Sequence, residues 1–224
     1  MRVSVVIPTL NESSELSETL AHLRLAGPVA EVIVADGGSR DGTVDLARAA
    51  GCRVIAAPRG RGFQLRAGAQ AATGDAILFL HADTWLPAGG MNALIETLQR
   101  PGVVGGAFAK AFRNPHWLMT GSRWKCRVRM HLWRFAYGDQ GVFVLRSVLE
   151  RIGGVPSVPL MEEHELFRRL VLEGNVELAN ATVLTSARRF RASGILTTYL
   201  RMILIETAWR LGVAPSALVR AYRS

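Results

Sequence analysis

The sequence has little that could form a covalent or metal-bound scaffold. Its 224 residues include two cysteines, Cys52 and Cys126, too few for a disulfide framework or a thiolate zinc cluster. The longest stretch without a charged residue, residues 84–95, is 12 residues long, well short of the roughly 20 apolar residues that span a membrane. The N-terminus lacks the charged and apolar segments of a secretion signal, so we expect a cytoplasmic location.

Two common nucleotide-binding motifs are also missing. No G-x-G-x-x-G string opens the first predicted helix, and no P-loop lysine motif occurs. These absences disfavour a dinucleotide oxidoreductase and a P-loop NTPase. Apolar residues make up 49% of the chain and charged residues 20%, which excludes a disordered or fibrous protein.

A net positive charge is present in one half of the chain only. Residues 1–108 carry 9 basic and 10 acidic side chains, whereas residues 109–224 carry 18 basic and 8 acidic ones. The net charge of +9 therefore belongs to the second half. This asymmetry indicates an anionic partner such as a phosphorylated ligand, a membrane surface or nucleic acid, or else a solvated basic face.

Short apolar segments alternate with helical patterns through the first hundred residues. We predict strands at residues 3–7, 31–35, 53–56, 76–80 and 103–109, and helices at 13–25, 43–50, 62–72 and 90–99. Ser13 and Ser14 offer N-cap hydroxyls for the first helix. Later we predict strands at 142–145 and 182–185, a helix at 162–172 and a helical tail from residue 195. The pattern predicts an α/β fold, a mostly parallel central sheet with helices on both faces and a helical C-terminal tail.

Aromatic and basic residues are interleaved over residues 116–133. Trp117, Trp124 and Trp133 lie among four arginines and lysines, with Arg134 directly after them, on one helix or two. Such a segment suits contact with nucleic-acid bases, a lipid interface or a sugar acceptor. It equally suits an amphipathic helix that docks its tryptophans on the sheet.

Four polar segments follow the first four strands in order. They are residues 8–12 (PTLNE), 36–42 (DGGSRDG), 60–62 (GRG) and 81–83 (HAD). In open α/β sheets, ligands gather beyond the carboxyl ends of the strands. There Asp36 can accept from a base or ribose, Arg61 at a helix N-terminus suits a diphosphate, and Asp83 can hold a divalent metal that bridges phosphates.

With these segments the chain resembles the inverting, family-2 type glycosyltransferases, which have the GT-A fold. The residues that carry the resemblance are 5–12, 36–43, 81–83 and 161–170, and it covers at least residues 3–170. Residues 60–64, 80–84, 137–141 and 185–189 resemble more narrowly a bacterial subgroup of arsenosugar-biosynthesis glycosyltransferases. The resemblance implies a glycosyltransferase domain at residues 1–190, with a nucleotide-binding half (1–109) and an acceptor half (110–190), before a tail at 191–224.

The resemblance also implies a set of site residues. Donor and cofactor contacts fall on Pro8, Thr9, Glu12, Asp36, Gly38, Arg61, Gln64, Asp83, Asp139 and Gln140. Thr9, Glu12 and Asp36 would hold the nucleoside, and Arg61 would face the diphosphate. Asp139 and Gln140 would line the donor-sugar or acceptor pocket. Gly105 and Gly106 would leave room for the sugar, or form a turn or bulge.

Two positions depart from the family pattern. Asp83 is the last carboxylate of the D-x-D motif and would ligate Mn²⁺ or Mg²⁺, but His81 replaces the first aspartate. His81 would be a second metal ligand, or else fill space at the strand end. The family's E-D pair, whose aspartate is the general base, is here Glu162 and Glu163. Glu163 would be the base, or the pair would form the acidic first turn of a helix.

We therefore predict an inverting transfer of a sugar from a nucleotide-diphosphate donor, a UDP-sugar by preference, to a small-molecule or lipid-linked acceptor. The alternatives are a sugar-phosphate nucleotidylyltransferase and a non-catalytic nucleotide-binding or membrane-associated scaffold. A nucleotidylyltransferase needs a glycine-rich, basic loop after the first strand, which residues 8–12 do not provide. We expect no nucleic-acid partner.

The tail leaves two interpretations open. Large apolar residues fill residues 195–211, interrupted by three charges, and residues 188–224 hold seven arginines against one acid. The tail would be a helix lying on a membrane, as in a peripheral protein at the inner face, or a helix that seals the domain or a homodimer interface. The second interpretation is favoured here, because apolar residues on both sides of a stripe are commonly buried by protein.

Overall fold

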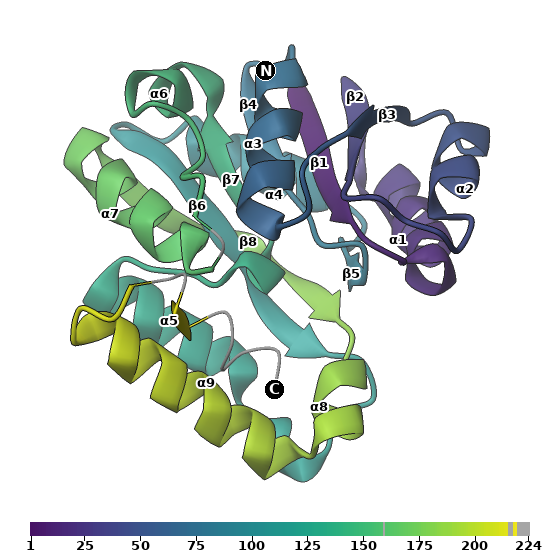
Figure 1. Cartoon of the computed structure of the whole chain (residues 1–224). Coiled ribbons are helices and arrows are strands. Elements are labelled where there is room, and N and C mark those ends of the chain that lie inside the picture. Colours follow the sequence, from purple (N-terminus) through teal and green to yellow (C-terminus); the bar gives the residue numbers. More distant parts are fainter. Residues whose placement is uncertain (159, 215–216, 219–224) are drawn as a thin grey trace.

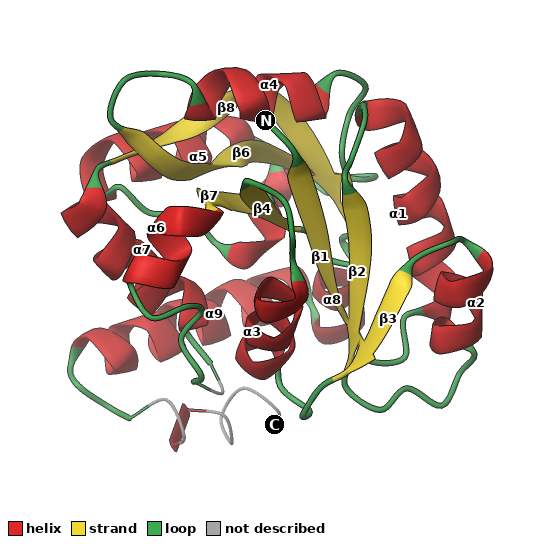
Figure 2. Cartoon of the chain, turned by 90° about the horizontal axis from the view of Figure 1, so that it is seen from above, coloured by secondary structure: helices red, strands yellow, loops and turns green. Residues whose placement is uncertain are grey.

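The computed structural model describes residues 1–158, 160–214 and 217–218. One eight-stranded sheet has the strand order β3-β2-β1-β4-β7-β6-β8-β5 (Figures 1 and 2). The strands are β1 (Val3–Thr9), β2 (Glu31–Asp36), β3 (Arg53–Ala56), β4 (Ala76–Phe79), β5 (Thr84–Trp85), β6 (Val103–Phe112), β7 (Val142–Leu145) and β8 (Asn175–Thr185). The helices are α1 (Ser13–Ala26), α2 (Thr43–Ala49), α3 (Arg61–Ala71), α4 (Gly90–Leu98), α5 (Ser122–Trp133), α6 (Arg146–Arg151), α7 (Glu162–Glu173), α8 (Arg188–Ser193) and α9 (Ile195–Arg210), with short 3-10 turns η1 (Trp117–Met119) and η2 (Gly138–Gln140).

Parallel pairing joins the strands of the first half. β1 pairs in parallel with β2 and β4, and β2 with β3, whereas β7 runs antiparallel between β4 and β6. β6 and β8 are again parallel. Strands buried on both faces read as continuous apolar runs, as β1, β2 and β4 do. The predicted α/β class is confirmed.

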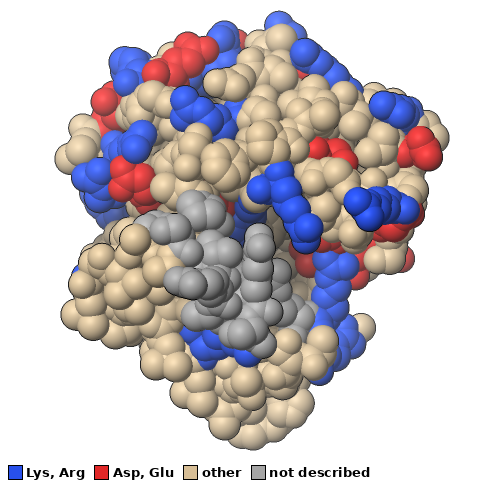
Figure 3. All heavy atoms as spheres, in the orientation of Figure 1, with Lys and Arg blue, Asp and Glu red and all other residues tan. Residues whose placement is uncertain are grey.

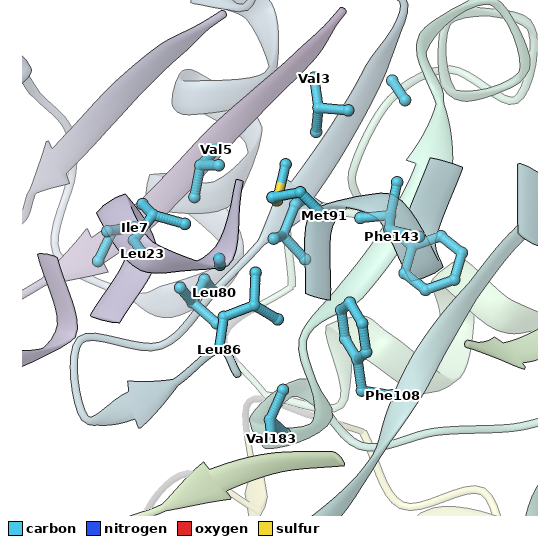
Figure 4. Packing of buried hydrophobic residues seen from close by; sticks show 14 of the residues in the cluster. Val3, Val5, Ile7, Leu23, Leu80, Leu86, Met91, Phe108, Phe143 and Val183 are labelled. Atoms are coloured by element: carbon cyan, nitrogen blue, oxygen red, sulfur yellow. The ribbon is translucent and has the colours of Figure 1, made fainter. Parts of the chain in front are cut away.

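Helices cover both faces of the sheet. On one face Val5 of β1 packs in a core cluster with residues of α1 and α4, including Leu23 and Met91 (Figure 4). On the other face the next residue, Val6, packs with residues of α3, α6 and α7. Successive side chains of a strand point to opposite faces, so one strand contributes to both cores. The predicted boundary at residue 109 falls inside β6, so the two proposed halves share one sheet.

The structure corrects the predicted helix cap and the glycine pair. Ser13 is the first helical residue of α1, and Glu12 occupies the N-cap position without a side-chain cap bond. A Cβ on Gly106 would lie 1.9 Å from the carbonyl oxygen of Glu177, next to a register shift between β6 and β8. Gly105 and Gly106 therefore allow the backbones of the neighbouring strands to approach β6 closely. Of the interpretations given for this glycine pair, the bulge is the correct one.

The aromatic and basic segment forms η1 and α5, and its tryptophans do not dock on the sheet. Trp117, Trp124 and Trp133 are 71%, 67% and 60% exposed, while Cys126 and Met130 are the buried residues of α5. The docking interpretation is therefore wrong. The helix packs through two sulfur-containing side chains and leaves its rings on the surface.

The tail helix α9 runs beside α5, below the sheet in Figure 1. Thr198 and Ile205 are buried on its inner face, where Ile195, Tyr199 and Met202 also pack on the domain. Leu196, Leu200, Ile203 and Leu204 are exposed on its outer face. The predicted helix from residue 195 and its packing role are thus present. Residues 215–216 and 219–224 of the predicted tail lie outside the described residues.

None of the helices in the described part of the chain combines the length and the apolar character that a bilayer-spanning helix needs.

Candidate active site

Asp36 is the last residue of β2, and groups of the protein itself donate hydrogen bonds to its carboxylate. It accepts hydrogen bonds from the Thr9 hydroxyl (2.9 Å), the backbone N–H groups of Gly38 (2.9 Å) and Ser39 (2.8 Å), and the Ser39 hydroxyl (2.5 Å). Burial would raise the pKa of Asp36, but these bonds lower it below its ordinary value. A carboxylate has about four acceptor positions, so a ligand would reach Asp36 by replacing the Ser39 hydroxyl.

The loops after β1 and β2 are locked together. The backbone N–H of Asn11 donates to the Ser39 hydroxyl (2.8 Å), and its side-chain oxygen accepts from the N–H of Arg40 (2.8 Å). The N–H of Glu12 donates to the Thr43 hydroxyl (2.9 Å). These contacts hold one rigid platform at the carboxyl ends of two neighbouring strands.

Arg188 joins Glu12 to Asp83. Its guanidinium forms an ion pair with Glu12, and its Nε lies 3.7 Å from the Asp83 carboxylate. Burial raises the pKa of Glu12, although the Arg188 guanidinium offsets part of that rise. Arg113 lies in the loop after β6, and its guanidinium donates to the backbone oxygen of Asp83 (3.2 Å). The ends of β1, β4 and β8 thus meet at Asp83.

Arg61 lies against the acidic pair of α7. Its Nε donates to Glu162, and its Nη2 donates to both Glu163 oxygens at 3.0 and 3.1 Å. Both glutamates are buried in the first turn of α7, at 3% and 9% exposure. Burial raises the pKa of Glu162. Burial acts on Glu163 in the same direction, but the guanidinium of Arg61 outweighs it and lowers the pKa of Glu163. Any diphosphate would share Arg61 with this pair.

His81 lies under η2. A Cβ added to Gly138 would lie 3.0 Å from the His81 Nε2, which has no hydrogen-bond partner among the described residues. Burial and the nearby Arg61 guanidinium lower the pKa of His81. Next to it, Asp139 forms an ion pair with Lys110. Burial would raise the pKa of Asp139, but the ammonium of Lys110 lowers it.

Two predicted binding residues make hydrogen bonds that cross-link the fold. Gln64 is buried and donates to the backbone oxygens of Thr9 (2.6 Å) and Ala35 (3.0 Å). Gln140 is fully buried, donates to the Phe108 backbone oxygen (2.8 Å) and accepts from Arg129. We therefore leave both amides out of the site proposed below. Pro8 lies near the end of β1, paired with residue 35 of β2.

A divalent metal would fit this site only if the protein and the substrate phosphates together supplied its ligands. Within residues 1–158, 160–214 and 217–218, no three His, Cys, Asp or Glu side chains gather as a complete metal site. Asp83 is half-buried, and no hydrogen bond to its carboxylate is present in the described part. Mg²⁺ and Mn²⁺ in phosphate-binding enzymes are commonly held by one or two carboxylates together with substrate phosphates. Asp83 can supply such a carboxylate. His81 lies instead beside Gly138 and the Arg61 guanidinium.

Sequence reasoning did not identify three positively charged residues of the site individually. Lys110, Arg113 and Arg188 come from β6, the loop after it and the start of α8, late in the chain. Arg188 lies within residues 185–189, one of the segments that carry the narrower family resemblance. That resemblance was the signal that could have found it. For Lys110 and Arg113 the basic second half was the only signal.

The glycosyl transferase family 2 model matches residues 4–153, which include β1 to β7 and the strand-end segments described above. The chain belongs to glycosyl transferase family 2. The family resemblance and the expected class of enzyme are therefore confirmed.

Curated relatives match parts of the chain. An undecaprenyl-phosphate 4-deoxy-4-formamido-L-arabinose transferase of Pseudomonas paraeruginosa is 33% identical over 138 residues, 56% of this chain and 40% of that protein. An uncharacterised glycosyltransferase of Mycobacterium tuberculosis is 36% identical over 99 residues, 44% of each chain. The matches thus span less than half the length of these relatives.

Solved structures show the same fold. A mannosyltransferase of Pyrobaculum calidifontis, in complex with GDP-Man and Mn²⁺, superposes with a TM-score of 0.68 at 23% identity, covering 99% of this chain and 68% of that one. A glucosyl-3-phosphoglycerate synthase of Mycobacterium tuberculosis, in complex with Mn²⁺, UDP and phosphoglyceric acid, gives 0.63 at 22% identity, covering 95% and 79%. The predicted GT-A fold is confirmed.

Proposed function

We propose that this protein transfers a sugar from a nucleotide-diphosphate donor, preferably a UDP-sugar, to an acceptor hydroxyl with inversion at the anomeric carbon. One observation carries the proposal. The ends of β1, β2 and β4 bring Glu12, Asp36 and Asp83 to one edge of the sheet, and a buried acidic pair begins α7 nearby. A nucleoside site, a place for a metal-bound diphosphate and a base are the parts that such a transfer needs.

Asp83 is the proposed metal ligand. When Mn²⁺ or Mg²⁺ is bound, it supplies positive charge to the leaving diphosphate. The likeness to structures that contain Mn²⁺ with GDP-Man or UDP supports this proposal. Arg188, beside Asp83, adds a cation on the same side. The platform of Asp36 and Ser39 would orient the nucleoside, because its loops are fixed by their mutual hydrogen bonds.

Glu163 is the proposed general base. The guanidinium of Arg61 keeps its carboxylate charged, and both of its oxygens are held in one orientation. Glu163 accepts the acceptor's hydroxyl proton while the acceptor oxygen bonds to the anomeric carbon and the bond to the diphosphate breaks. Glu162 is a positioning residue, because it accepts a hydrogen bond from the Nε of Arg61. This bond fixes the orientation in which the Arg61 guanidinium meets Glu163.

Nucleotide release and product stereochemistry test this proposal. The purified protein is given a panel of UDP- and GDP-sugars with an acceptor panel, with and without Mn²⁺, and anomeric configuration is read by NMR. We expect metal-dependent release of the nucleoside diphosphate and a product of inverted configuration. A retained configuration would contradict inversion. Nucleotide binding without release from any donor would favour the non-catalytic scaffold.

The outer face of α9 supports a proposed partner. Leu196, Leu200, Ile203 and Leu204 are exposed there, and the lower part of the molecule in Figure 3 is mainly uncharged with basic side chains beside it. The exposed Lys125 of α5 lies over the Tyr199 ring of α9, with its Nζ 5.7 Å from the ring centre. In a two-fold dimer through this face, like charges would meet, whereas an anionic bilayer would attract them. We therefore propose peripheral contact with an anionic membrane rather than a homodimer.

A further inference from the structure

A small cavity lies between the residues that follow β4, the turn η2 and the first turn of α7. It is lined by His81, Gly138, Glu162 and Glu163 and otherwise by apolar side chains, and the volume open to water in it is about 20 Å³. We propose that this cavity binds one water molecule, and that His81 acts through this water as a positioning residue for the acidic pair. This inference rests on the proposed function, because it assigns His81 to the site of the proposed base.

Two polar atoms of the residues that line this cavity are buried without a hydrogen bond. They are the Nε2 of His81 and the Oε2 of Glu162, and neither has a partner within residues 1–158, 160–214 and 217–218. Glu162 as a whole is only 3% exposed. A buried polar group that makes no hydrogen bond is costly, and ordered water commonly supplies the bond that protein groups do not. Both atoms therefore call for a polar partner inside the cavity.

One water molecule has the size and the chemistry that this cavity requires. A buried water needs about 10–15 Å³ of such space and two to four polar partners. The cavity offers about 20 Å³ and the free atoms of His81 and Glu162. Water both donates and accepts, so it can donate to the Glu162 oxygen and bond to the His81 nitrogen whether or not that nitrogen carries the proton. A ligand of several heavy atoms would exceed this volume.

The water would hold the second oxygen of Glu162 while Arg61 holds the first. Glu162 Oε1 accepts from the Nε of Arg61, and the Nη2 of Arg61 donates to both oxygens of Glu163 at 3.0 and 3.1 Å. Without the water, Glu162 Oε2 would compete for another N–H of Arg61, because a bidentate pair of arginine and carboxylate is strong. Arg61 would then turn away from Glu163, and the orientation of the proposed base would be lost.

The same geometry separates His81 from the proposed metal ligand. Asp83 does not line the cavity, and its carboxylate lies 3.7 Å from the Nε of Arg188. The Nε2 of His81 lies instead beside Gly138, where an added Cβ would be 3.0 Å from it. A nitrogen that bonds to the water is not available to a metal at the same time. His81 therefore serves the acidic pair, although it occupies a position of the D-x-D motif.

Crystal structures without donor or metal test the water site directly. His81→Gln keeps a polar atom near the position of Nε2, whereas His81→Leu fills a similar volume with an apolar group. We expect a water about 2.7–3.2 Å from Glu162 Oε2 and from the polar atom of residue 81 in the natural chain and in His81→Gln. In His81→Leu we expect no such water, and two hydrogen bonds from Arg61 to Glu162 in place of those to Glu163.

Gly138→Ala removes the water without changing His81. Its methyl group would lie 3.0 Å from the His81 Nε2 and so enter the cavity, and the backbone of Gly138 has no positive φ that would oppose an alanine. We expect this variant to lack the water and to show the same turn of Arg61 toward Glu162. It keeps the proposal open to contradiction if His81→Leu does not fold.

Turnover and metal dependence distinguish a positioning role from a structural one. With the donor that the UDP- and GDP-sugar panel identifies, we expect His81→Leu and Gly138→Ala to lower kcat about tenfold or more, and His81→Gln to restore most of it. Mn²⁺ should strengthen UDP binding in all three variants, since Asp83 is unchanged. His131→Leu is the control, because His131 is an exposed residue of α5. It should change neither quantity.

Three results would overturn the proposal. They are a natural chain without the water, equal kcat values for His81→Leu and His81→Gln, or a His81→Leu variant in which Mn²⁺ no longer strengthens UDP binding, which would make His81 a metal ligand. The outcome is separate from that of the proposed function. A natural chain that holds the water but releases no nucleoside diphosphate keeps the water site and loses the proposed activity. A chain that releases nucleoside diphosphate without the water keeps the activity and loses this role of His81.

Discussion

The acidic side chains of the site differ in how far the protein already neutralises them. Asp36 accepts four internal hydrogen bonds, and Glu162 and Glu163 share one guanidinium. Asp83 is different, because its nearest cation, Arg188, also serves Glu12. Of these carboxylates, Asp83 is therefore the one most available to a ligand, and Glu163 the one whose orientation is most strictly held.

Replacing the proposed base should separate binding from turnover. Glu163→Gln keeps the size of the side chain but removes its capacity to accept a proton, so we expect turnover to fall about 10²-fold or more with UDP affinity nearly unchanged. Steady-state kinetics and calorimetry measure the two quantities. Glu165→Gln is the control, since Glu165 lies in the same helical turn but pairs with Arg168 and Arg169. An active Glu163→Gln beside an inactive Glu162→Gln would reverse the assignment.

The hydrogen bonds to Asp36 should make stability depend on pH. Because the pKa of Asp36 is lowered in the folded state, its stabilisation is present above the unfolded pKa of about 3.9 and is lost as pH falls through the lower folded value. We expect Asp36→Asn to lower the free energy of unfolding by about 1–3 kcal/mol at pH 7. Urea titrations of both proteins should show this difference shrinking below pH about 4. A constant difference down to pH 2 would refute the explanation.

At the residue scale, sequence reasoning could place the strand-end side chains but could not identify their partners. The carboxyl ends of parallel strands share an edge, which predicts that Asp36 and Asp83 lie on the same side of the sheet. Arg61 was expected to face a diphosphate, yet it pairs with Glu162, 101 residues later in the chain. No local pattern specifies a contact across that separation.

At the scale of helices and strands, close packing of α3 on β1 depends on one glycine. A Cβ on Gly68 would lie 2.2 Å from a methyl carbon of Val6, so the helix and strand would have to move apart. We expect Gly68→Ala to lower the free energy of unfolding by about 1–3 kcal/mol despite its better helix propensity. Denaturant unfolding measures the change. Gln70→Ala, an exposed change in the same helix, is the control, and a stabilised Gly68→Ala would contradict this account.

Elements with strong apolar patterns were predicted well, and elements defined by pairing were not. β3 and β7 have the predicted bounds, whereas β8 begins at Asn175, seven residues before the predicted strand. Its first residues show no strict alternation of exposed and buried positions and include polar side chains, so their pairing with β6 identifies them as strand. β5 is two residues long and α6 and α8 six each, too short to give a periodic signal.

At the scale of the whole molecule, the outer face of α9 should direct the protein to anionic membranes. Flotation with phosphatidylglycerol vesicles should recover bound protein at low salt and less at high salt, since each well-placed cation contributes about 1 kcal/mol. Leu200→Asp with Leu204→Asp should abolish flotation, because both exposed leucines lie on that face. Leu25→Asp, an exposed change on α1, should not. Salt-independent flotation, or a dimer in solution that the double variant dissociates, would contradict the membrane proposal.

The central claim is that the edge of the sheet around Asp83 holds a metal-bound nucleoside diphosphate. Calorimetric titration of UDP, with and without Mn²⁺, tests it most directly in three proteins: the natural chain, Asp83→Asn and Asp45→Asn. Asp45 is an exposed residue of α2, where the same change leaves the edge intact. We expect Mn²⁺ to strengthen UDP binding to the natural chain and to Asp45→Asn, and to have no effect on Asp83→Asn, because a neutral amide is a poorer ligand for a hard cation. Unchanged Mn²⁺-dependent binding in Asp83→Asn would contradict the account.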